Sequence, residues 1–128
     1  WEAAFAPLVP EASFYDPLCY DKHAVNYFQW EFLDGDAELL PGLRIITTPG
    51  HTRGHQSVLF QTEQGVVCVS GDICNVAENV NGNLEPNIVV MVPEVYESFQ
   101  RIRQTSHFIL PGHEPGIRDG SEVFIAVD

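Results

Sequence analysis

The sequence predicts an α/β fold in which short strands form a sheet and a helix covers it. Three observations lead to this prediction: apolar runs of strand length between glycine and proline turns, one segment with helical periodicity, and three strand-like runs that end in glycine and a polar residue. The chain has 128 residues, of which 45% are hydrophobic, so one domain with a substantial core is expected. No repeat, low-complexity tract or linker divides the sequence.

The first expected strands follow an irregular start. Residues 1–30 mix aromatic residues, prolines and short helical patches without a regular period, so only helix and loop are expected there. The strands expected next are residues 31–33, 37–40 and 43–48. Turns at 34–36 (Asp-Gly-Asp) and 41–42 (Pro-Gly) separate them, because these residue types adopt the backbone angles that tight turns require. The pattern predicts a meander.

Further strands and one helix follow along the chain. The strands expected here are residues 57–62, 66–70, 107–110 and 122–127. The tripeptide Glu-Gln-Gly between the first two favours a hairpin. Pro93 opens the expected helix, because proline suits the first helical turn, and Val95, Phe99 and Ile102 recur on one of its faces. That face is expected to pack on the sheet.

Charge and cysteine content exclude several classes of protein. The formal net charge is -12, from 18 acidic and 6 basic residues, so nucleic acid is a poor partner because its phosphates are bound mainly by Lys and Arg. No apolar run approaches the ~20 residues of a membrane span, and no signal segment is recognisable. The three cysteines form no Cys-x-x-Cys pair. This favours a reducing compartment, and the cytoplasm is the expected location.

Three of the strand-like runs end in the same way. They lead to Pro49-Gly50-His51, to Gly71-Asp72 and to Pro111-Gly112-His113. A glycine lets the backbone turn sharply and approach a ligand closely, while the strand fixes the direction of the next side chain. Sites in open α/β sheets lie just beyond strand ends. We hypothesise that His51, Asp72 and His113 converge there, and two imidazoles with one carboxylate suit zinc or a similar divalent metal.

Each of these residues also has an ordinary interpretation. A single histidine is more often a surface or capping residue than a ligand, and Gly-Asp after a strand is commonly a turn or a helix cap. His55 is expected to be structural, because the glycine between it and His51 weakens a helical spacing. His23 and His107 lack a glycine junction. Cys74 is either a thiolate ligand or, more simply, a small buried residue beneath the site.

Taken in order, the motifs resemble the metallo-β-lactamase superfamily. TPGHTRGHQS is similar to that superfamily's third metal motif, GDIC to its bridging-aspartate motif and PGHEP to its last histidine motif. The run LPGLRIITTPGHTRGHQSVLF, followed by GDICNVAEN, looks most like the N-acyl homoserine lactonase branch. This resemblance implies an αβ/βα four-layer sandwich, with residues 1–128 forming the C-terminal part of one such domain and covering mainly its second half. It also implies that His51 binds a first metal, Asp72 bridges two metals and His113 binds the second.

Two positions depart from the family pattern. The family's upstream His-x-His-x-Asp-His motif does not occur in the 128 residues, so Trp1 is expected to fall shortly after that motif. The lactonase branch usually places a tyrosine three residues after the bridging aspartate, where this chain has Asn75. An asparagine amide can donate a hydrogen bond to a carbonyl or an oxyanion. Asn75 is therefore a candidate substrate-binding residue.

The resemblance implies a metal-dependent hydrolase with two zinc or similar divalent ions. Metal coordination lowers the pKa of water from near 16 to about 7, and a metal-bound hydroxide then attacks a lactone, ester or amide carbonyl of a small molecule. Asp72 would be the catalytic residue that bridges the ions and orients the hydroxide. Thr52, His55 and Glu114 are expected to contact the ligands from outside and to fix the histidine tautomers.

Two alternative functions remain beside the lactonase-like hydrolase. The first is a thioester hydrolase of the glyoxalase II kind, although ICNVAENVNG lacks the apolar and glycine-rich run that usually follows Gly-Asp there. The second is a non-catalytic fragment or pseudo-enzyme module, because the first metal motif is missing. Whichever function the complete protein has, the isolated 128-residue chain is expected to be inactive. It is expected to need the N-terminal half of the fold, or a second copy in a homodimer, to cover an apolar sheet face.

Overall fold

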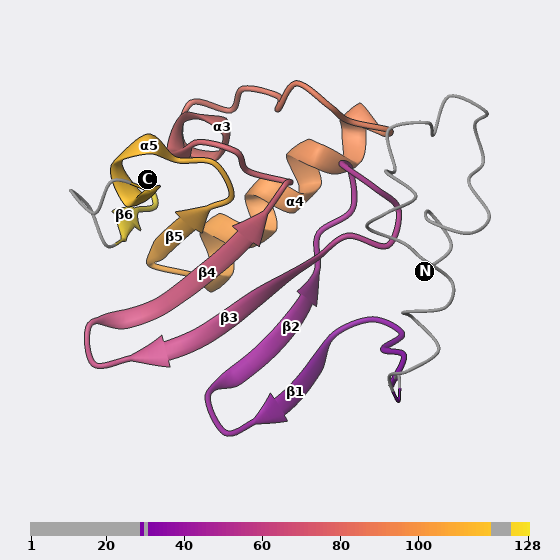
Figure 1. The fold of residues 1–128 in the computed structure, drawn as a ribbon, viewed down its shortest axis with the longest axis vertical. Coiled ribbons are helices and arrows are strands. Elements are labelled where there is room, and N and C mark those ends of the chain that lie inside the picture. The colour runs from indigo at the N-terminus through magenta and orange to yellow at the C-terminus, as the bar shows by residue number, and fades with distance from the viewer. Residues whose placement is uncertain (1–28, 30, 119–123) are drawn as a thin grey trace. The chain divides into compact units, whose positions relative to one another are not determined.

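The computed structural model describes residue 29, residues 31–118 and residues 124–128 (Figure 1). The expectations for residues 1–28, including His23, lie outside this range. The chain divides into two compact units, residues 1–34 and 35–128, and the fold described below belongs to the second unit. No helix among the described residues has the length and hydropathy needed to cross a membrane.

Within the described residues the sheet has six strands, which lie side by side in the order of the chain. They are β1 (Ala37–Leu40), β2 (Leu43–Thr47), β3 (Gln56–Thr62), β4 (Gly65–Gly71), β5 (Phe108–Pro111) and β6 (Ile125–Ala126). The β4–β5 pair is parallel, and the other neighbouring pairs are antiparallel. The predicted meander and hairpin are thus confirmed.

The strand expected at residues 31–33 is not formed, because these residues have irregular backbone. Among the described residues β1 is the first strand of the sheet. Phe32 is 67% exposed. A three-residue segment of this kind gains little from pairing, because strand stability depends on side chains that pack across the sheet.

The predicted helix is α4 (Val92–Thr105), which has Pro93 in its first turn. Val95, Phe99 and Ile102 are fully buried, as their helical spacing predicts. Two further helices are α3 (Ala77–Asn81) and α5 (Pro115–Arg118). Both are too short to give a periodic pattern, which explains why the sequence did not predict them.

The two faces of the sheet differ in what covers them. Ile46, Leu59, Cys68 and Ile109 share one face by register and pack with α3 and α4 in one buried cluster, and both helices lie on that side of the sheet (Figure 1). The opposite face is also apolar, and its side chains take no part in that cluster. They are Ile45, Val58, Phe60, Val67, Val69, Phe108 and Leu110. This opposite face is called the second face below.

Candidate functional site

Three strands bring the predicted ligands to one edge of the sheet. Strands β2 and β4 both run antiparallel to β3, and β5 runs parallel to β4. Their C-terminal ends therefore lie at the same edge, where His51, Asp72 and His113 follow β2, β4 and β5. The end of β2 is about 10 Å from that of β4, because β3 lies between them. The loop from Thr48 to His55 crosses this gap.

Asp72 lies between the two predicted histidine ligands. Its Oδ1 is 3.0 Å from Nε2 of His113, and its Oδ2 is 3.6 Å from Nε2 of His51. Each carboxylate oxygen thus faces its own imidazole. The Asp72 side chain is 52% exposed, so the group is open to solvent on one side. One carboxylate thus lies between two histidines.

The backbone at Ile88 determines how His51 presents its ring. Nδ1 of His51 lies 2.8 Å from the carbonyl oxygen of Ile88. A carbonyl only accepts hydrogen bonds, so Nδ1 carries the proton and Nε2 keeps its lone pair. That lone pair and the Asp72 carboxylate are both acceptors, and they face one another without a proton between them. A cation between them would suit both, which is the chemistry of a metal ligand set with a fixed tautomer.

Glycines at the three junctions permit close contacts between backbones. Gly50 has φ +135°, and a Cβ there would lie 2.6 Å from Cγ2 and 2.9 Å from the backbone nitrogen of Val95. A Cβ on Gly112 would lie 2.9 Å from the carbonyl oxygen of Gly71, whose own φ is +55°. The recurrence of Pro-Gly-His therefore has a steric cause: each glycine lets a neighbouring element approach the strand end.

The histidine loop is closed by its own backbone and by His55. The amide of Thr48 donates to the carbonyl of His55 at 2.9 Å, and the carbonyl of Thr52 accepts from Gly50 and His55. Nδ1 of His55 lies 2.9 Å from Oγ1 of Thr48. Burial lowers the pKa of His55, and the positive potential of protonated His51 lowers it further. The expected outer residues His55 and Thr52 are thus part of the loop that carries His51, Thr52 through its backbone.

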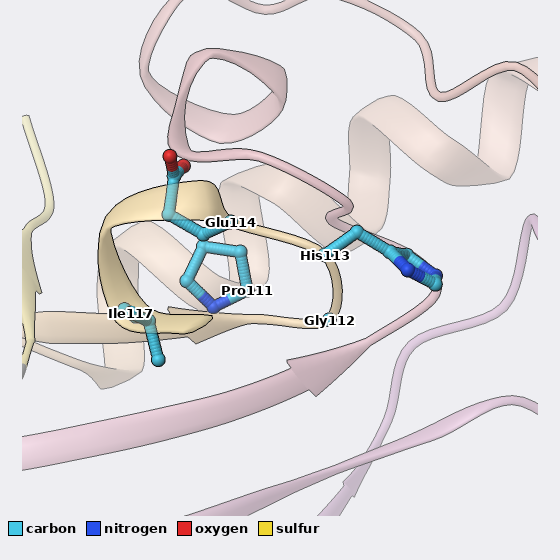
Figure 2. A pocket seen from close by; sticks show the side chains of 5 residues that line it. All are labelled: Pro111, Gly112, His113, Glu114 and Ile117. Carbon is cyan, nitrogen blue, oxygen red and sulfur yellow. The ribbon is translucent and has the colours of Figure 1, made fainter. Parts of the chain in front are cut away.

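Two other predicted residues lie beside His113. The carbonyl of Asn75 accepts from the amide of His113 at 2.9 Å, and its side-chain Oδ1 is buried without a partner among the described residues. Glu114 accepts from the amide of Ala77 at 2.9 Å, at the start of α3. It binds helix backbone and no imidazole. A pocket of about 360 Å³ has Glu114 and His113 in its wall (Figure 2), and the His113 ring points away from Glu114.

The remaining candidates have structural surroundings. Cys74 is fully buried, and burial raises the pKa of its thiol to about 11. These observations favour Cys74 as a packing residue and argue against a thiolate ligand. Nδ1 of His107 accepts from the amide of Val66 at 3.1 Å. Sequence reasoning missed the Ile88 carbonyl and the buried hydroxyls of Thr48 and Ser57. A carbonyl leaves no mark in a sequence, although Thr48 and Ser57 do flank the histidine motif.

The described residues do not form a complete metal cage. Among them no group of three or more His, Cys, Asp and Glu side chains is arranged to hold a single ion. His51 and His113 instead approach opposite oxygens of Asp72, as two separate pairs. Their donor chemistry fits two metal positions that share a carboxylate, with further ligands needed at each.

Comparison with known proteins gives relatives in sequence, while no family model matches. An N-acyl homoserine lactonase from Bacillus sp. is 43% identical over 51 residues, which are 39% of this chain and 20% of that protein. One from Bacillus cereus is 41% identical over 51 residues, with the same two shares. The matched segment is thus a small part of those enzymes.

Solved structures match over nearly the whole chain. An N-acyl homoserine lactone hydrolase, with the product N-hexanoyl-L-homoserine bound at its catalytic metal center, has a TM-score of 0.70 and 26% identity, and the match covers 97% of this chain and 49% of that one. A quorum-quenching N-acyl homoserine lactone lactonase matches with a TM-score of 0.71 and 27% sequence identity. That match covers 97% of this chain and 51% of the lactonase chain. A probable metal-dependent hydrolase from Staphylococcus aureus shares the fold, with a TM-score of 0.55 and 17% sequence identity. That match covers 64% of this chain and 31% of the hydrolase chain. The chain spans about half the length of the two lactonase structures.

Proposed function

Because the chain has the metallo-β-lactamase fold and is similar in sequence to the N-acyl homoserine lactonase branch of that superfamily, we propose that it is the C-terminal part of a metal-dependent hydrolase that opens a lactone. Residues 1–128 would supply mainly the second half of one such domain. The observation that supports this most is the position of Asp72 between Nε2 of His51 and Nε2 of His113, at three strand ends.

In this proposal His51 and His113 each bind one divalent ion through Nε2, and Asp72 bridges the two ions. Zinc suits imidazole and carboxylate ligands of this kind. When bound, such ions polarise a carbonyl and bring the pKa of a coordinated water toward neutrality. The missing ligands would come from the rest of the protein.

The residues of this chain orient the ligands and the substrate. The Ile88 carbonyl keeps the His51 proton on Nδ1, so that Nε2 stays free for a metal. Asn75 is the proposed substrate contact. Its Oδ1 is closed off from solvent, which leaves its amide nitrogen as the group that donates to a substrate carbonyl. The pocket beside His113 would take part of a small molecule.

The replacement Asp72→Ala tests this function in the full-length protein. We expect loss of hydrolysis across a panel of lactones, together with a fall in bound zinc from about two ions per molecule, because the bridging group is removed. Asp34→Ala, which removes an exposed carboxylate before β1, should leave both unchanged. Turnover and metal content that stay normal in the Asp72 variant would remove this residue from the mechanism.

We also propose that the second face is covered in the complete protein, by the N-terminal half of the fold or by a second copy. Phe60 and Phe108 each lie near Phe124, with ring centroids 6.2 Å apart, so this face carries large apolar side chains. Val67 is fully buried on this face and Ile45 is 9% exposed, whereas Val58, Phe60, Val69, Phe108 and Leu110 are only half-buried. An apolar face that stays partly open to solvent promotes association. The two described cysteines are free thiols, which fits the reducing cytoplasm as its location.

Light scattering on the isolated 128-residue chain tests the covered face. We expect oligomers or poor solubility, and a shift toward smaller species when Val58 on the second face is replaced by Lys. A matched Gln61→Lys replacement, at an exposed position of β3 on the opposite side of the sheet, should not produce the shift. A stable monomer of the unmodified chain would contradict the proposal.

A further inference from the structure

A row of buried hydroxyl groups leads from the sheet to His55. Thr48, Ser57 and Ser70 are all fully buried, although each carries a polar side chain. Oγ1 of Thr48 lies 2.9 Å from Nδ1 of His55 and 2.7 Å from Oγ of Ser57, and Ser57 donates to the carbonyl of Ser70 at 3.4 Å. We call Thr48, Ser57 and the Ser70 carbonyl the hydroxyl relay. Polar groups at this depth are retained only when their hydrogen bonds are satisfied.

The three contacts of the relay, His55 with Thr48, Thr48 with Ser57 and Ser57 with the Ser70 carbonyl, are satisfied together by one arrangement of protons. The Ser70 carbonyl only accepts, so Ser57 uses its single proton there, and its oxygen must accept from Thr48. Thr48 then has no proton left for His55. Nδ1 of His55 must therefore carry a proton and donate to Thr48, and Nε2 of the neutral ring is left as an acceptor.

The free nitrogen of His55 lies next to the turn that carries Asp72. A Cβ placed on Gly71, the residue before Asp72, would be 3.2 Å from Nε2 of His55. If Nε2 carried a proton, it could donate to the Asp72 carboxylate, and bonds of this charge-assisted kind are strong. Such a bond would compete for the oxygens that now face His51 and His113.

We infer that Thr48 and Ser57 are positioning residues that hold His55 in the Nδ1–H tautomer, so that both oxygens of Asp72 remain available to the metal site. The effect of the His55 tautomer on metal binding rests on the proposed function, whereas the tautomer itself is a property of the fold. The inference assigns a role to two buried hydroxyls that touch neither ligand nor substrate. The Nδ1 proton of His51 is fixed separately, by the carbonyl of Ile88.

The tautomer can be read directly from long-range proton–nitrogen NMR correlations of the imidazole rings, at a pH where neutral imidazole predominates. The experiment uses the full-length protein without metal, with the His55→Gln variant to assign the signals. We expect His55 to be protonated at Nδ1. In Ser57→Ala the Thr48 hydroxyl is released and can donate to Nδ1, so the Nε2–H form should appear. Thr48→Val removes the acceptor and should give the same change, whereas Thr48→Ser should keep the original tautomer.

Ser106→Ala is the matched control, because Ser106 is a buried serine that donates to the Ile102 carbonyl at 2.7 Å and takes no part in the relay. It should leave the His55 signals unchanged. In zinc titrations Ser57→Ala should weaken binding about 10-fold, the lower end of what outer partners of metal ligands contribute, and Ser106→Ala should not. An Nε2–H signal in the unmodified protein, or an unchanged tautomer in folded Ser57→Ala, would overturn the inference. Absence of zinc binding in every variant would instead refute the proposed function, since the tautomer result stands independently.

Discussion

At the first Pro-Gly-His junction the His51 side chain is 21% exposed, whereas at the second the His113 side chain is 65% exposed. His51 is held on one side by the Ile88 carbonyl and lies in a loop that its own backbone closes. His113 projects from a turn, and its ring is held by Asp72. The same tripeptide therefore produces a fixed ring after β2 and an open one after β5. The tripeptide alone therefore does not determine the geometry, and residues distant in sequence determine the orientation of each ring.

Gly50 and Gly112, the glycines of the two junctions, also differ in the elements that they contact. Gly50 has a positive φ and the start of α4 beside it, and its carbonyl accepts from the amides of Val90 and Met91. A Cβ on Gly112 would lie 2.9 Å from the carbonyl oxygen of Gly71 and 3.5 Å from Oδ1 of Asp72, and Gly112 has no positive φ. The first junction is therefore fixed by a helix as well as by a strand, and this difference can be measured.

Replacement of each glycine by alanine gives the largest expected effect. Gly50→Ala adds backbone strain to a clash with Val95, so the free energy of unfolding should fall by about 2 to 4 kcal/mol. Gly112→Ala adds a contact with one carbonyl and should cost about 1 to 3 kcal/mol. Urea denaturation of the variants measures both.

Gly54→Ala is the control, because a Cβ there meets nothing within 4 Å and the residue has no positive φ. It should leave the stability unchanged or raise it by less than about 1 kcal/mol. Equal losses at the two junction glycines would show that α4 does not distinguish them, and the comparison would then be wrong.

The two histidines should differ in how their loss affects metal binding. His51→Ala removes a ring that is already oriented, so zinc affinity should fall by more than about 100-fold, beyond the range of outer partners. His113→Ala removes a more exposed ring that must lose more freedom on binding, so its loss should be smaller, about 10- to 100-fold. Isothermal titration of the full-length protein with zinc compares them.

His107→Asn serves as the matched control for these replacements. His107 accepts from the amide of Val66 at the opposite end of the β4–β5 pair, and the asparagine carbonyl can take over that bond. Its zinc affinity should equal that of the unmodified protein. A greater loss in His113→Ala than in His51→Ala would reverse the assigned order of the two sites.

Much of this fold could be predicted from the sequence because its signals are local. The turn residues at Asp34–Asp36 and at Pro41-Gly42, and the spacing of Val95, Phe99 and Ile102, each depend on a few neighbouring residues. Residues 31–33 have the same local appearance as a strand, but a strand also needs a partner, which no local pattern contains. Helices α3 and α5 were not predicted, because about one turn of helix is too short to show a periodic pattern.

The convergence of the three junctions was predictable in outline, because strand ends that point the same way meet at one edge. The details were not. The Ile88 carbonyl contacts His51 across 37 residues of sequence, and Glu114 reaches the Ala77 amide across the same separation. Contacts of this kind follow from the packing of α3 and α4 on the sheet, so only the folded chain reveals that Glu114 binds a helix start.

The β4–β5 pair that carries Asp72 and His113 should also respond to pH through Cys68, which pairs with Ile109. Burial raises the pKa of the Cys68 thiol from 9.0 to about 12. Between these values the folded protein keeps a proton that the unfolded chain releases, so this contribution to stability is complete below pH 9.0 and falls as the pH rises. The loss should be about 1 kcal/mol by about pH 10. Cys68→Ala should remove this slope, so the stability that it loses relative to the unmodified protein should be largest below pH 9.0 and shrink as the pH rises. Urea denaturation across the range compares the two proteins. Parallel curves would show that Cys68 does not make the stability of the β4–β5 pair depend on pH.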